Sequence, residues 1–210
     1  MAGFLSNLRY VVWTSIGLAV LFFLAYTIGV QHRTLDDAGF WEAALRWAHV
    51  LSGIMWIGLL YYFNFVQIPN APKIPEEARG PAIGKVIAPA ALFWFRWAAM
   101  STLVFGLLIA CLKGYLLPAY TLGLVGVGGL NADFCRFIGV GMWLATIMWF
   151  NVWFVIWPNQ QRALNIDNKY PDLDAAAKAA AGKTAMLFSR TNTLLSIPML
   201  VAMTGAQTLG

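Results

Sequence analysis

The apolar segment Trp47–Gly58 (WAHVLSGIMWIG) contains His49, one of only two histidines in the chain. An imidazole in hydrocarbon costs free energy unless it has a partner, so an ionisable residue at such a position indicates a functional site. Gly53 follows one helical turn later on the same face and leaves room for a flat macrocycle, and Trp56 continues the strip. This pattern predicts a site for haem or another metal chelate, with His49 as the metal ligand. A histidine that only donates a hydrogen bond to a carbonyl of a neighbouring helix is an equally good interpretation.

The elements that must position this strip are membrane helices. Hydrophobic residues make up 60% of the chain and charged residues 11%, whereas soluble domains carry about 25% charged residues. A helix needs about 20 apolar residues to span a bilayer. The apolar runs are continuous, which favours helices over alternating strands. We therefore predict an all-α integral membrane protein, a single domain over residues 1–210, with five spans at residues 10–30, 43–68, 92–112, 137–157 and 186–204.

The distribution of Lys and Arg between the loops predicts the orientation. One side of the membrane holds Arg33, Arg46, Lys113 and Arg136. The other side holds more basic residues, namely Arg9, Lys73, Arg79, Lys85, Arg96, Arg162, Lys169, Lys178, Lys183 and Arg190. The N-terminus is therefore expected in the cytoplasm and the C-terminus in the periplasm. This topology explains the net charge of +5 without a nucleic-acid partner.

The loop at residues 158–185 is predicted to contain a short helix that lies on the membrane surface. Asp172 or Asp174 can cap its N-terminus, and Gly182 with Lys183 suits its end. Elsewhere in the loops, Cys111 and Cys135 fit no Cys-x-x-Cys-His motif for covalent haem attachment. Whether these two cysteines form a disulfide remains open from the sequence.

Two polar features lie inside the predicted spans. Asn151 and Asn64 are expected to form hydrogen bonds between helices, although Asn151 is also a candidate contact for a cofactor. Pro198 deprives the carbonyl of Leu194 of its helical donor and is expected to kink the last span. Such a kink leaves room for a neighbouring helix or a cofactor.

Four stretches taken together resemble the membrane part of the bacterial membrane-bound urate oxidase (urate hydroxylase, PuuD type). They occur in the family's order and are Arg46–Gly58, Phe93–Trp97, Asn151–Gln160 and Ser189–Pro198. The His49 motif alone is also similar to the copper-resistance membrane proteins and to the small membrane protoporphyrinogen oxidase. The resemblance implies a redox module in a bacterial inner membrane, cytoplasmic or intracytoplasmic, that binds haem b and passes electrons to a c-type cytochrome.

The chain departs from the family pattern at several positions. That pattern has histidines near Phe93, Gly139 and Thr191 and a lysine near Arg96, and this sequence has none of them. The family's cytochrome domain is not in this sequence either. These departures argue against urate oxidation by this chain alone.

Other residues are candidates to complete a haem site. Met100 or Met142 can supply a second axial ligand. Arg96 can clamp a haem propionate, although it lies roughly 15 Å deeper than His49 at 1.5 Å per residue. The alternative is a non-catalytic accessory subunit of a larger respiratory, oxidase or photosynthetic membrane complex, or a homo-oligomer, which kept the scaffold and lost the ligands.

Overall fold

The computed structural model describes residues 2–209, apart from the side chains of Ala2, Glu76 and Leu209, and this part of the chain contains helices and no strand. The chain divides into two compact units, Met1–Ala44 and Leu45–Gly210. The single domain expected over residues 1–210 stays a prediction. The first unit is dominated by one apolar helix, Leu8–Leu24.

The first unit contains α1 (Ala2–Leu5), α2 (Leu8–Leu24), the π-helical turn η1 (Ala25–Val30) and the beginning of α3 (Ala38–Tyr61). Asp37 precedes α3 and accepts a hydrogen bond from the backbone N–H of Gly39 at 2.7 Å. It also pairs with Arg33 at 2.8 Å. The Gly39 N–H and the Arg33 guanidinium hold the pKa of the Asp37 carboxyl below its usual value.

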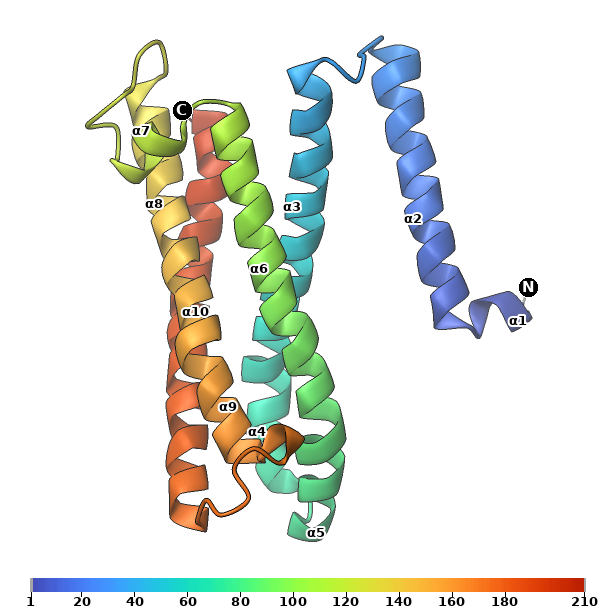
Figure 1. The fold of residues 1–210 in the computed structure, drawn as a ribbon, viewed down its shortest axis with the longest axis vertical. Coiled ribbons are helices and arrows are strands. Elements are labelled where there is room, and N and C mark those ends of the chain that lie inside the picture. Colours follow the sequence, from blue (N-terminus) through green and yellow to red (C-terminus); the bar gives the residue numbers. More distant parts are fainter. Residues whose placement is uncertain (1, 210) are drawn as a thin grey trace. The chain divides into compact units, whose positions relative to one another are not determined.

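The second unit is a helical bundle in which the rest of α3, α6, α8 and α10 run side by side (Figure 1). After α3 come η2 (Tyr62–Gln67), α4 (Ile68–Asn70), η3 (Ala71–Lys73), α5 (Glu76–Arg79), η4 (Gly80–Ile87), α6 (Ala88–Leu112), α7 (Leu116–Tyr120), α8 (Ala132–Phe150), η5 (Asn151–Ile156), α9 (Trp157–Leu164), η6 (Ile166–Asn168) and α10 (Ala175–Leu209). The short helix α7 lies at one end of this bundle. The opposite end carries α5 and the loop between α9 and α10 (Figure 1).

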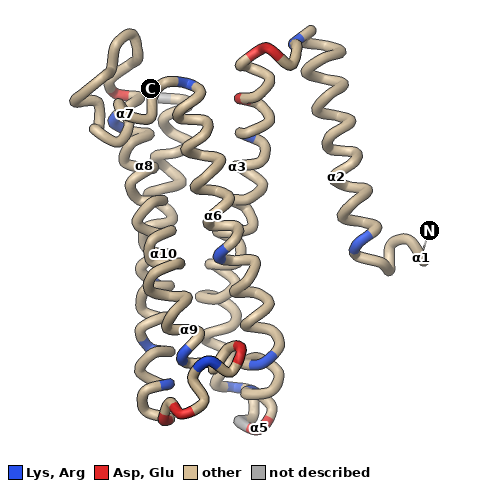
Figure 2. The backbone as a smooth tube through the Cα atoms, viewed as in Figure 1, with Lys and Arg blue, Asp and Glu red and all other residues tan. Residues whose placement is uncertain are grey.

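Five helical segments of the described chain are long and apolar enough to cross a membrane. Each predicted span lies inside one of them: Leu8–Val30, Ala38–Lys73, Glu77–Leu112, Ala132–Leu164 and Ala175–Thr208. Most of these helices extend well beyond the predicted spans, because hydropathy marks only the apolar part of a helix. The structure therefore confirms an all-α fold with five candidate spans, while the orientation stays a prediction. Figure 2 displays the basic residues on which that prediction depends, with many at the end of the second unit that carries α5 and the α9–α10 loop.

The separate surface helix predicted in the loop at residues 158–185 is wrong. Asp174 does act as a cap, because it accepts a hydrogen bond from the Ala177 N–H at 2.6 Å. The helix that begins there is α10, however, and it continues through Gly182 to Leu209. A glycine ends a helix when it adopts a left-handed conformation, and Gly182 does not. It packs instead against α9, where a Cβ atom would lie 3.7 Å from the Ala163 Cβ.

Prolines follow three of the π-helical turns of the second unit. Pro69, Pro89 and Pro158 each stand two residues after the end of η2, η4 and η5, respectively. A proline inside a helix lacks an N–H donor and its ring clashes with the carbonyl four residues earlier. A widened turn just before the proline relieves that clash, so the helix can continue through it. These turns place Asn64 and Asn151 where the backbone is locally irregular.

Small residues bring the helices of the second unit close together, as is usual for helices that pack in lipid. A Cβ atom on Gly139 of α8 would collide with the carbonyl oxygen of Ala119 in α7, and one on Gly205 of α10 would collide with the ring of Phe137. One apolar cluster surrounds Trp56 and Phe95. A second cluster lies nearer α7 and includes Ala119.

Candidate functional site: a cavity around His49

A cavity of about 640 Å³ lies between α3, α6, α8 and α10, and Tyr115 and Tyr120 beside α7 contribute to one end of it. Sites for cofactors and small ligands have volumes of about 300 to 1,000 Å³ and are mostly apolar with a few polar groups. The lining follows that pattern. Its polar residues are Arg46, His49, Thr102, Tyr115, Tyr120, Thr204 and Gln207.

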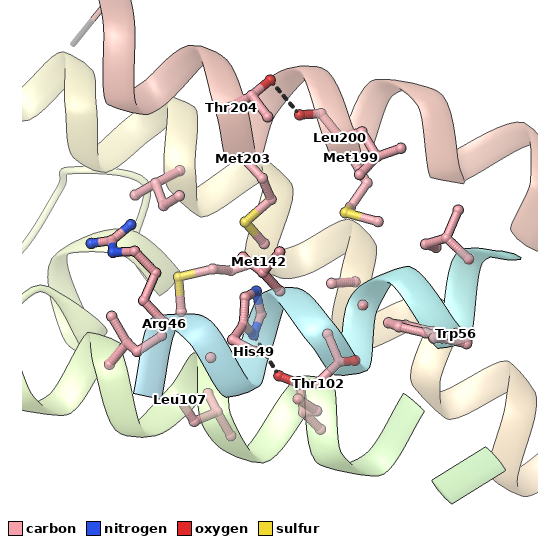
Figure 3. Close-up of a pocket in the computed structure, with 18 of the residues that line it drawn as sticks. Arg46, His49, Trp56, Thr102, Leu107, Met142, Met199, Leu200, Met203 and Thr204 are labelled. Atoms are coloured by element: carbon pink, nitrogen blue, oxygen red, sulfur yellow. Dashed lines mark hydrogen bonds between the residues drawn. The ribbon is translucent and has the colours of Figure 1, made fainter. Parts of the chain in front are cut away.

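His49 projects from α3 into this cavity and binds the facing helix through one ring nitrogen. Its Nδ1 lies 2.9 Å from the carbonyl oxygen of Thr102 on α6. Because a carbonyl only accepts hydrogen bonds, Nδ1 carries the proton and donates it. In the neutral ring the lone pair then belongs to Nε2. Figure 3 shows the second ring nitrogen pointing away from Thr102 toward Met142.

Glycine on α6 makes this arrangement of the imidazole possible. A Cβ atom on Gly106 would lie 3.0 Å from Cε1 and 3.2 Å from Nδ1 of His49. Gly106 stands four residues after Thr102, and because it has no side chain, the Thr102 carbonyl is accessible from α3. The Thr102 hydroxyl does not compete for the ring, because it donates to the Ala98 carbonyl at 2.7 Å.

Gly53 and Trp56, the other members of the predicted strip, also line the cavity. Gly53 faces α6, and a Cβ atom there would lie 3.9 Å from Thr102 Cγ2. Trp56 is 1% exposed, and its indole N–H has no hydrogen-bond partner among the described residues. The three residues therefore form one wall of the cavity.

Arg96 does not line this cavity. Its guanidinium lies 3.6 Å from the centroid of the Trp157 ring and 5.7 Å from that of Phe93. The Trp153 indole donates to the backbone carbonyl of Arg96 at 3.2 Å, which ties α6 to η5. Antiparallel packing of α6 against η5 thus offers Arg96 a cation–π contact, far along the helix from His49. Arg96 is therefore not placed to bind a propionate of a haem in this cavity.

Asn151 also lies outside the cavity and binds α10. Its Nδ2 donates to Asn192 Oδ1 at 2.8 Å, and Asn192 Nδ2 donates to the Met148 carbonyl at 2.9 Å. Asn192 is fully buried and Asn151 nearly so. The hydrogen bond between helices predicted for Asn151 is therefore confirmed.

Replacing Asn192 by leucine is expected to destabilise the folded protein by about 1 to 2 kcal/mol, since hydrogen bonds between membrane helices contribute about 0.6 to 2 kcal/mol. The substitution leaves the buried Asn151 amide without its acceptor. Thermal unfolding in detergent measures the effect. Thr191→Leu is the control, because Thr191 directly precedes Asn192 on α10 and is exposed. Equal stability of the two variants would contradict a stabilising role for this pair.

Several cavity residues were not identified as site residues from the sequence. Arg46 was counted only as a loop charge, yet it lies one turn before His49 and lines the cavity. Met142, a candidate second ligand from the sequence, lines the cavity from α8. Met199 and Met203, which were not candidates, line it from α10, opposite His49 (Figure 3). Their spacing on α10 is that of any buried helical face, so the sequence carried no distinguishing signal. Met100 is not among the lining residues.

None of the positions where the family resemblance places a histidine faces this cavity. Phe93 is 46% exposed, Thr191 is exposed, and Gly139 packs against the Ala119 carbonyl. Within residues 2–209 no group of three or more His, Cys, Asp or Glu side chains is arranged to hold a metal ion. Cys111 and Cys135 are both free thiols. The donor set suits a chelate that brings most of its own ligand atoms better than it suits a bare metal ion.

The comparisons with known proteins bear on the side of this cavity that α8 and α10 form. No curated protein and no solved structure matches the chain. Residues 130–207, which run from the start of α8 almost to the end of α10, match the family model described as urate oxidase N-terminal. That region contributes Met142, Met199 and Met203 to the cavity but not His49. The match shows that this part of the chain is similar to that family.

Proposed function

We propose that the second unit is a membrane redox module of urate-hydroxylase-like type that binds haem b through His49 and passes electrons to a partner protein. The observation that carries this proposal is the bond between His49 Nδ1 and the Thr102 carbonyl. It leaves the lone pair of Nε2 for a metal, next to a largely apolar cavity of about 640 Å³. Haem ligands commonly have this form, because a second hydrogen bond fixes the tautomer and orients the ring.

The polar and sulfur-containing residues of the cavity have distinct roles in this proposal. His49 Nε2 would hold the iron, and Thr102 would hold the imidazole and make it a stronger donor. A thioether from Met142 or Met203 would serve as a second ligand, a combination that raises the reduction potential. Arg46, at one end of the cavity, can pair with a propionate. The bound haem would supply one-electron chemistry, and the apolar walls would pack against its faces.

The proposed partner follows from where the cavity lies in the bundle. Arg46, Tyr115 and Gln207 place it in the half that contains α7. With the N-terminus in the cytoplasm, as the basic residues predict, this half faces the periplasm of a bacterial inner membrane. A c-type cytochrome there is the chemical partner that the family resemblance implies. Its docking would bring a second haem within reach of the cavity.

A non-catalytic accessory subunit of a larger membrane complex is the second candidate function. One observation favours it: the bond between His49 and Thr102 already satisfies one ring nitrogen, as a structural histidine requires. In that case the cavity is occupied by lipid or by a neighbouring subunit. Homo-oligomers of this chain belong to the same class of explanation.

An optical spectrum of the protein purified from native membranes separates the two functions. If haem is bound, we expect a Soret band that shifts when dithionite reduces the sample, with about one haem per chain by pyridine haemochrome assay. A featureless spectrum, both before and after incubation with free haem, would overturn the haem proposal and leave the accessory role.

A further inference from the structure

A line of buried polar side chains continues from the cavity along one face of α10. Ser196, Asn192 and Ser189 have exposed fractions of 0%, 0% and 7%, and they recur at the spacing of one helical face. Met199 and Met203 extend the same face into the cavity. The polar line therefore begins where the cavity ends and runs toward the end of the bundle that carries the α9–α10 loop.

The facing side of α3 and η2 carries matching polar groups. The Tyr61 hydroxyl lies 3.0 Å from Ser196 Oγ. One turn further on, Asn64 Nδ2 donates to Ser189 Oγ at 2.8 Å and to the Leu60 carbonyl at 2.9 Å. Ile57, one turn before Tyr61, lines the cavity. Two polar pairs thus join these helices between the cavity and the far end, and Asn192, which lies between them on α10, bonds Asn151 and the Met148 carbonyl instead.

Direct hydrogen bonds pair most of these side chains, but three buried polar atoms on and beside the polar face of α3–η2 are left over. Trp56 Nε1, Asn64 Oδ1 and Gln67 Oε1 are buried and have no hydrogen-bond partner in the described part of the chain. All three belong to the continuous helix α3–η2, and they extend from the cavity wall past Asn64. Buried polar atoms are paired in the great majority of cases. Water molecules are the usual partners when protein groups are not.

We propose that the polar faces of α3–η2 and α10 enclose a file of water molecules that connects the His49 cavity with the α9–α10 loop end of the bundle. Hydroxyl, amide and indole groups line it, which is the composition that ordered water requires. The file gives protons a path through the apolar bundle to the cavity. Proton movement along this file would balance the charge when a haem changes oxidation state, and that role rests on the proposed function. The presence of water in the file does not depend on the haem.

Cysteine labelling tests the hydration directly. Ser189→Cys and Ser196→Cys are introduced singly in a Cys111→Ser background and reconstituted in lipid nanodiscs. The probe is ethylammonium methanethiosulfonate, which reacts with the thiolate. Ala99→Cys is the matched control, because Ala99 is 0% exposed and packs in the apolar cluster of Trp56 and Leu60. Cys135, which is buried, remains in every variant as the background.

We expect both serine-position cysteines to react at least about tenfold faster than Ala99→Cys, since each unit by which apolar surroundings raise a thiol pKa lowers the thiolate fraction tenfold. Ser189→Cys should react faster than Ser196→Cys because it lies nearer the loop end. Rates equal to that of Ala99→Cys, in variants that melt like the parent, would overturn the water file.

A measurement on the unmodified protein covers the case in which a cysteine variant does not fold. The Trp56 indole N–H is expected to exchange with deuterium, followed by NMR, faster than that of Trp153, which is hydrogen-bonded to the Arg96 carbonyl. Equal protection of the two indoles would contradict the proposal.

The test of the water file is separable from the test of haem binding. Fast labelling with a featureless spectrum keeps the water file and removes the haem, and slow labelling with a Soret band does the reverse.

Discussion

Replacing His49 by alanine is expected to abolish haem binding, with the Soret band lost in membranes and after incubation with free haem. The substitution removes the one imidazole that lines the cavity. No other cavity side chain replaces it well, because a methionine thioether alone is a weak ligand. The expected loss is at least about 100-fold in haem affinity, since removal even of the outer groups that orient a metal ligand costs about 10- to 100-fold. Haem stoichiometry and the midpoint potential of the residual haem are the readouts.

The controls separate ligation from folding. His32→Ala removes the other histidine, which lies in the exposed loop before α3, and should leave the spectrum unchanged. Added imidazole should restore a Soret band in His49→Ala, because the lost side chain leaves space of its own shape next to Gly106. A histidine that served only to bond Thr102 would show no such rescue. An unchanged Soret band in His49→Ala would contradict ligation by this residue.

Hydropathy was sufficient to predict the helices but not their ends. The five apolar runs lie inside five helices because lipid offers no hydrogen-bond partners, so each segment must satisfy its backbone groups internally, as a helix does. The alanine-rich segment after Asp174 was misassigned to a separate surface helix. Its weak hydropathy gave no sign that it continues into the last span, and Gly182 looked like a stop. Gly182 instead stays helical and faces Ala163 of α9, a neighbour that only the tertiary structure reveals.

The sequence was sufficient to predict the site residues that lie on a single helix. His49, Gly53 and Trp56 share a face of α3, and all three line the cavity. The partners came from other helices, whose depth and rotation a sequence does not give. Arg96 was therefore preferred to Arg46 for a propionate, although Arg46 lines the cavity and Arg96 stacks on Trp157.

Gly106 and Thr102 illustrate a second limit of sequence reasoning. A glycine within an apolar helix has many uses, and nothing in the α6 sequence indicates an imidazole against it. Only the antiparallel pairing of α3 and α6 brings His49 to that point, 3.0 Å from where a Cβ atom would be. The tautomer of His49, on which the proposed function depends, follows from this pairing alone.

Gly139 is where the packing leaves least room for change, and its replacement by alanine is expected to destabilise the second unit by about 3 kcal/mol or more, the upper end of the cost of overpacking. A Cβ atom there would collide with the Ala119 carbonyl oxygen and lie 2.9 Å from the carbonyl carbon. The obstacle is backbone, which no change of side-chain rotamer can remove. A histidine at this position, as the family resemblance expects nearby, would require α7 to lie elsewhere.

Movement of α7 would have consequences beyond the clash. The Trp143 indole donates to the Tyr120 carbonyl at 3.0 Å, and the Tyr120 hydroxyl lies 2.9 Å from Thr146 Oγ1. Displacing α7 weakens both bonds and shifts Tyr120 at the edge of the cavity. Gly139→Ala is therefore expected to lower haem affinity together with stability. In His49→Ala, by contrast, affinity is lost while the helices stay packed.

Thermal unfolding and SDS titration in detergent measure the effect of Gly139→Ala, and Gly182→Ala serves as the matched control. A Cβ atom on Gly182 meets only an ordinary contact, 3.7 Å from Ala163 Cβ, in the same unit of the fold. That variant is expected to gain about 0.5 to 1 kcal/mol, the usual cost of glycine inside a helix. If Gly139→Ala unfolds at the parent's midpoint, α7 does not pack on α8 as described, and the end of the cavity that Tyr120 forms must be open instead.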